Sequence, residues 1–193
     1  FTCGLTKEII LALTRFPEFV VVGPLFRDVL QDKGMDLRDI GQEYGVRFVL
    51  DGSIRKHSDT IRLIVKLNET VNGTRLWGQS VDYNLQRNSV LEIENQLVGR
   101  ISATIADAYG VIPRSLAKES LAHRSECLSD YDAVLRFYHY FRFLEGQSMV
   151  EAIDALEKAV QKKPDNALTL AMLGDLVASM YQFGFEDSLS VLD

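Results

Sequence analysis

The chain has 193 residues, of which 47% are hydrophobic and 25% are charged, and its formal net charge is −6. This composition is ordinary for a globular protein, and the length allows one large domain or two small ones. A nucleic-acid partner requires a basic stripe, which the scattered Lys and Arg residues do not form. We also expect no direct membrane insertion, because no apolar run approaches the roughly 18–20 residues of a spanning helix.

The start of the sequence reads as the middle of a structural element. Phe1-Thr2-Cys3-Gly4 has neither an initiator Met nor a basic segment ahead of an apolar run, so no signal peptide is recognised. We therefore expect the sequence to be a fragment of a longer protein, in which an anchor can lie upstream.

No catalytic, cofactor-binding or metal-binding residue is predicted. Cys3 and Cys127 are most simply two unpaired small side chains, since a disulfide requires an oxidising compartment and close approach. The isolated His and Cys residues lack the spacing of a zinc site. The sequence also has no nucleophile elbow, no phosphate-binding loop and no convincing pair of acids.

The first part of the chain mixes helical and strand patterns. Residues 5–16 have apolar side chains at helical spacing, with Thr2 as candidate N-cap and Pro17 as the stop. The β-branched run 19–22 predicts a strand covered on both faces, and residues 25–35 less clearly predict a short helix. A further helix is expected from the N-cap Asp36 to Gly45, which fits a left-handed C′ position.

Residues 46–83 predict a three-stranded antiparallel meander, because apolar and polar side chains alternate along them. Residues 57–59 are the first turn, and Asn72-Gly73 predicts a two-residue hairpin turn with positive φ at both positions. On the first two strands the apolar side chains expected to share one face are Val46, Phe48, Leu50, Ile54, Ile61, Leu63, Val65 and Leu67. On the third strand, Leu76 and Gly78 alternate with Trp77, Val81 and Tyr83.

Two helical regions follow the meander. Ser89 and Glu92 predict a capping box, and Gly110 and Pro113 are expected to end that helix. Its apolar stripe should cover one face of the sheet. After a connector over residues 113–130, which can hold a short helix, no strand pattern remains. The expected C-terminal helices are an aromatic-rich one ending near Gly146, a second from Val150 to Val160 before Pro164, and a third capped by Asn166.

The C-terminal part resembles the tetratricopeptide repeat, a 34-residue helix–turn–helix unit. Ala152, Leu156, Ala159 and Pro164 match the second helix of a repeat and its closing proline, and Leu173-Gly174 matches the next first helix. The first helix departs from the pattern, because Phe137 stands near a position that is usually small. The resemblance therefore covers one imperfect repeat and half of another.

The N-terminal part, to about residue 108, resembles the TolB-like amino-terminal domain family. The matching phrases are FTCGLTKEI at residues 1–9, Arg15-Phe16-Pro17, and MDLRDIGQEYGVRFVLDGSIR at residues 35–55. Leu76-Trp77 and Asp82-Tyr83 match the later signature, whereas Glu94–Leu97 departs from the usual Q-D-E-I. The first strand of that family is missing here.

The fold class expected from these patterns is α/β (α+β). It comprises an N-terminal domain, residues 1–112, with a mixed sheet that includes the meander, a connector over residues 113–130, and tetratricopeptide-like helices over residues 131–193. Members of the TolB-like family commonly place this domain ahead of tetratricopeptide repeats, after a class III adenylate or guanylate cyclase domain or a membrane-anchored winged-helix domain.

The resemblance implies a non-catalytic sensory and protein-interaction region of a bacterial signalling protein, an adenylate cyclase above all. A winged-helix regulator, a periplasmic TolB-like scaffold and an unrecognised enzyme with a site between the domains remain open alternatives. The expected partner is a protein bound by the helical repeats, with a small ligand or a homodimer also open. The periplasmic side of a membrane is favoured over the cytoplasm.

Several residues are candidates for a site, but the sequence favours an ordinary structural role in each case. Asp51-Gly52 with Arg47 and Arg55 can face an anion, but a solvated strand face is expected. Trp77 and Tyr83 are expected to pack under a helix, and His57 to be a plain turn residue. The aromatic cluster Phe137, Tyr138, Tyr140, Phe141 and Phe143 is too wide for one buried face, so part of it should meet the α/β part or a partner. Two sequons begin at Asn68 and Asn72 and carry no meaning in a bacterial protein.

Overall fold

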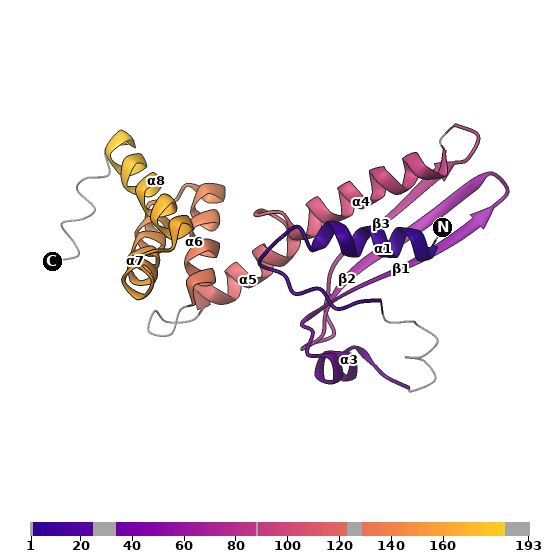
Figure 1. Ribbon diagram of the computed structural model, residues 1–193, viewed down its shortest axis with the longest axis horizontal. Helices are drawn as coiled ribbons and strands as arrows, with labels where there is room; N and C mark the ends of the chain where they lie inside the picture. The colour runs from indigo at the N-terminus through magenta and orange to yellow at the C-terminus, as the bar shows by residue number, and fades with distance from the viewer. Residues whose placement is uncertain (1, 25–33, 88, 123–128, 184–193) are drawn as a thin grey trace. The chain divides into compact units, whose positions relative to one another are not determined.

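The computed structural model describes residues 2–24, 34–87, 89–122 and 129–183 (Figure 1). Its contacts divide the chain into two compact units, Phe1–Val111 and Ile112–Asp193. The first unit combines a sheet with helices and the second is helical, so the fold is of the α+β class. None of the described helices is long and apolar enough to cross a membrane.

The sheet of the first unit has three strands, β1 (Phe48–His57), β2 (Thr60–Glu69) and β3 (Arg75–Asn84), in the order β1-β2-β3. Both pairings are antiparallel, which confirms the predicted meander. The mixed sheet expected from the sequence is wrong for the described strands, because none of them pairs in parallel.

The residues 19–22, predicted as a covered strand, are not a strand. Val20 is 96% exposed and Val22 is 42% exposed. An extended segment becomes a strand only when its backbone groups bond to a neighbour, and no described strand lies beside this one. The short helix expected over residues 25–35 falls mainly on residues 25–33, which lie outside the described residues.

The first strand connection is the turn expected at residues 57–59, whereas the second differs from its prediction. Ser58 takes a positive φ of 50° in the tight turn between the paired residues His57 and Thr60. At Asn72-Gly73 only Gly73 has a positive φ, of 63°, so the predicted two-residue turn is wrong. The connection is wider, and it closes where the Glu69 N–H donates to the Thr74 carbonyl oxygen over 2.8 Å.

Helices α1 (Thr2–Leu13) and α4 (Val90–Ala106) contact each other, and Figure 1 shows both running along the sheet. The predicted capping box is confirmed, since Ser89 and Glu92 exchange hydrogen bonds with each other's backbone N–H. Alternate residues of β2 are buried together with the apolar stripe of α4, so these two faces form the core of the unit. The core residues are Ile61, Leu63, Val65, Leu67, Ile93, Leu97, Ile101 and Ile105.

Three helix ends lie at other residues than the sequence predicts. Thr2 is already helical in α1 rather than its N-cap, and the helix ends at Leu13, before Pro17. Helix α4 ends at Ala106 with Asp107 as its C-cap. Pro113 therefore does not end α4. It lies in the first turn of the next helix, α5 (Val111–Ala122), where a missing N–H costs little.

The helical unit contains α6 (Asp130–Phe143), α7 (Gly146–Lys162) and α8 (Ala167–Phe183), while α5 occupies most of the predicted connector. Gly146 begins α7 instead of ending α6, because Leu144 takes the left-handed C-cap position with φ 54°. The core forms between α6, α7 and α8, and small residues of α7 lie at its centre. Ala152 and Leu156 are fully buried, and Ala155 and Ala159 are nearly so.

Candidate interaction site

The segment that joins α3 (Leu37–Tyr44) to β1 contains the most distinctive motif of the sequence. Its residues make contacts that stabilise the fold. Asp36 caps α3 by accepting from the N–H groups of Arg38 and Asp39, and Gly45 has a φ of 63°, as predicted. A side chain at Gly41 would lie 2.7 Å from Cβ and Oγ1 of Thr70. Helix α3 can therefore approach the end of β2 only with glycine at this position.

Thr70 is itself fixed in place. Its hydroxyl donates to the carbonyl oxygens of Val46, over 2.8 Å, and Arg47, over 3.0 Å, and its N–H donates to the latter. Arg47 in turn donates through Nε and Nη2 to one carboxylate oxygen of Glu69, over 3.2 and 3.0 Å. Arg47 is thus part of the fold and not an unoccupied anion site.

The structure does not bring Arg47, Asp51 and Arg55 together. Asp51 and Arg55 lie four residues apart along β1, a separation of about 13 Å in an extended strand, and Arg47 precedes the first residue of β1. Asp51 lies opposite Lys66, and Arg55 lies opposite Arg62, on the sheet face that carries polar side chains. Gly52 pairs with Val65 on the other face. Of these residues, Arg55 is exposed on the polar strand face that the sequence favours, whereas Asp51 is half-buried there.

The neighbouring polar pair on this face is Arg62 and Asp82, which are joined by two 2.7 Å hydrogen bonds. Hydrogen bonding to Arg62 lowers the pKa of Asp82 and, in return, raises the pKa of Arg62. Both groups are exposed, and the pair ties β2 to β3 on the surface.

The remaining candidates of the first unit have structural positions. Trp77 and Tyr83 are half-buried and lie opposite the buried residues Leu67 and Ile61, so they pack on the covered face of the sheet. His57 is exposed at the end of β1. Asn68, the start of one sequon, is buried within β2.

Among the described residues, no group of three or more His, Cys, Asp and Glu side chains is placed to hold a metal ion. Cys3 is an exposed free thiol, and Cys127 lies outside the described residues.

The aromatic cluster of α6 is split between the core and the surface. Phe137 and Tyr140 are buried, and Tyr138 and Phe141 are partly buried against them. Phe143 is 52% exposed, with the His139 ring 4.8 Å away and the Arg142 guanidinium over its face. The cluster is therefore mainly a packing feature, with one exposed end.

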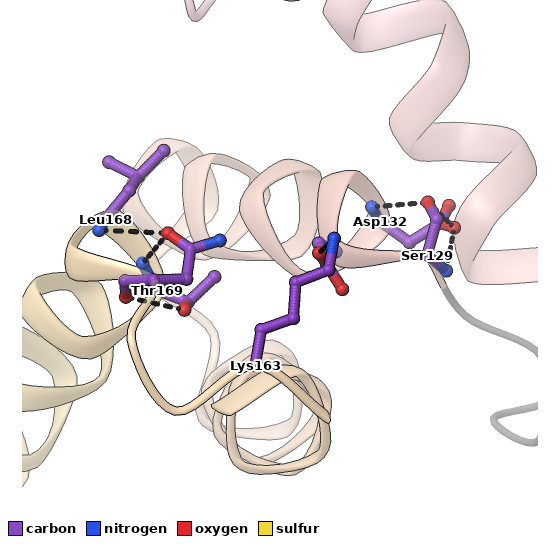
Figure 2. A network of polar contacts seen from close by, with 7 residues as sticks. Ser129, Asp132, Lys163, Leu168 and Thr169 are labelled. Atoms are coloured by element: carbon purple, nitrogen blue, oxygen red, sulfur yellow. Dashed lines mark hydrogen bonds and ion pairs between the residues drawn. The ribbon is translucent and has the colours of Figure 1, made fainter. Parts of the chain in front are cut away.

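Polar contacts fix the ends of the helices in the second unit (Figure 2). Lys163, after α7, lies 2.6 Å from a carboxylate oxygen of Asp130 at the start of α6. The hydrogen bond and charge of Asp130 raise the pKa of Lys163. Asn166 caps α8, as predicted, by accepting from the N–H groups of Leu168 and Thr169.

Helix α5 is held to α6 by a buried arginine. The Arg136 guanidinium donates to the Ser120 carbonyl oxygen over 2.8 Å. Burial raises the pKa of the nearby Asp132, but hydrogen bonds from Ser129 and Ser120 and the charge of Arg136 outweigh burial, so the pKa is below its ordinary value of 3.8. This polar cluster is internally satisfied, which makes it a structural element.

Helix α8 has several exposed apolar side chains, as does the end of α6 at Phe143 and Leu144. One side of α8 is buried against α6 and α7, where Leu176 is fully buried and Met172 and Met180 are nearly so. The adjoining side, here called the α8 face, consists of Leu170, Gly174, Val177 and Tyr181, which recur at i, i+4, i+7 and i+11. Leu170 is 44% exposed, Val177 37% and Tyr181 67%. Open space surrounds Gly174.

The sequence contained a signal for the α8 face that pattern analysis missed. From Ala167 to Phe183 the only Asp, Glu, Lys or Arg is Asp175. A helix that is apolar over most of its circumference normally packs on more than one side, whereas only one side of α8 is covered by α6 and α7.

Comparison with known proteins links the chain to an adenylate cyclase-related protein. No protein-family model matches it. The chain is 25% identical over 174 residues to a protein of Rhizobium meliloti (strain 1021) named "Putative adenylate cyclase 3". The match covers 90% of this chain and 29% of the relative, so the chain spans less than a third of the relative's length.

Proposed function

We propose that this chain is a non-catalytic regulatory and protein-interaction region of a larger cyclase-type signalling protein. In this proposal the first unit is a TolB-like domain and the second is a truncated set of tetratricopeptide-like helices. The α8 face binds a protein partner, and binding modulates cyclic-nucleotide synthesis by a catalytic region elsewhere in the protein.

The match to the cyclase-named relative is the observation that carries the proposal. It includes 90% of this chain, so both units take part, yet it leaves most of the relative outside the match. If this chain is a regulatory segment joined to a separate catalytic region, a match would include the regulatory segment and leave the catalytic region of the relative outside it. The candidate site residues of the first unit are engaged in folding or lie on a solvated strand face, which agrees with a role other than catalysis.

Two features of the helical unit support protein binding. Ala152, Ala155 and Ala159 are buried and allow α7 to pack closely with its neighbours, as stacked helical repeats require. The α8 face then presents apolar side chains with no described element covering them, which is the usual character of an interaction site.

The test begins with the complete coding sequence and the purified full-length protein. A variant lacking residues 131–183 should still form cyclic AMP from ATP, with kcat altered at least about threefold and the KM for ATP within about twofold, because catalysis and substrate binding lie elsewhere. A coding sequence without a cyclase domain, or a deletion that leaves kcat unchanged, would contradict the proposal.

A further inference from the structure

We draw no further inference here: the strongest candidate, the exposed apolar side of α8 with Leu170, Val177 and Tyr181, already belongs to the proposed function, and nothing among the described residues shows which partner covers it.

Discussion

The two units differ in how fully the apolar side of a helix is covered. In the first unit the stripe of α4 is covered along its whole length, and Ile93, Leu97, Ile101 and Ile105 are each at most 2% exposed. In the second unit α8 is covered on one side and open on the other. The first unit also contains the most recognisable phrase of the sequence, yet its residues are occupied by the fold. The most recognisable motif of the sequence therefore belongs to residues that fold the first unit, whereas an open apolar side is found on α8 of the second.

The largest expected effect comes from opening a cavity in either core. Leu97→Ala in α4 and Leu156→Ala in α7 each remove a side chain that is at most 2% exposed, and each should cost about 3 kcal/mol of unfolding free energy. Trp77 is the only Trp and lies in the first unit. The urea midpoint measured by Trp77 fluorescence should fall mainly for Leu97→Ala. The midpoint measured by far-UV circular dichroism should fall for both variants. Equal fluorescence shifts would show that the units unfold as one.

The same substitution at two helical glycines should act in opposite directions. Gly41→Ala forces a side chain to within 2.7 Å of Thr70, which is held by hydrogen bonds and cannot move aside, and should cost about 2 kcal/mol. Gly174→Ala meets open space and should gain about 0.5–1 kcal/mol from helix propensity. Urea midpoints measure both. A stabilising Gly41→Ala would contradict the close contact between α3 and β2.

Loss of a capping serine should have a smaller effect, of similar size in the two units. Ser89→Ala at α4 and Ser129→Ala at α6 each remove a hydroxyl that accepts the N–H of the third helical residue, and each should cost about 1 kcal/mol. Ser→Asp at the same positions is the control, because aspartate also caps. Thermal unfolding measures these changes, and caps without effect would indicate that packing alone sets both helix starts.

The smallest expected effect is a dependence of stability on acid. The pKa of Glu92 is lowered from 4.5 by hydrogen bonds from Ser89, and that of Asp132 is lowered from 3.8. A lowered pKa gives stability that is complete above the ordinary value and disappears as the pH falls through the folded value. Stability should therefore be flat near neutrality and fall below about pH 4.5. Glu92→Gln keeps the capping geometry without titrating. The unfolding free energy of this variant should therefore fall less steeply with decreasing pH than that of the wild type.

Local features of the fold could be predicted where the cause is local. The Asp36, Ser89 and Asn166 caps and the left-handed Gly45 depend on neighbouring residues, and each is confirmed. The alternation along β2 also predicted its buried face, because one side of a sheet must be covered.

Features that depend on distant partners could not be predicted in the same way. The run 19–22 has strand composition but no described neighbour, and the Asn72-Gly73 loop is wider than its sequence suggests because of the register shift at Leu67 and Asn68. Leu144 adopts a conformation that usually indicates glycine. The α8 face was not predicted, because sequence spacing alone does not show which apolar sides of a helix are covered. The TolB-like and tetratricopeptide-like assignments, the domain limits, the periplasmic location and the identity of the partner stay predictions.

We propose that this region takes part in cyclase signalling without performing the reaction. It is tested most directly by measuring cyclic AMP formed from ATP, in the presence of Mg²⁺ or Mn²⁺, by the isolated 193-residue chain and by the full-length protein. We predict that the full-length protein forms cyclic AMP and the isolated chain forms none. Cyclic AMP formed by the isolated chain in proportion to its concentration, or none formed by the full-length protein, would contradict this account.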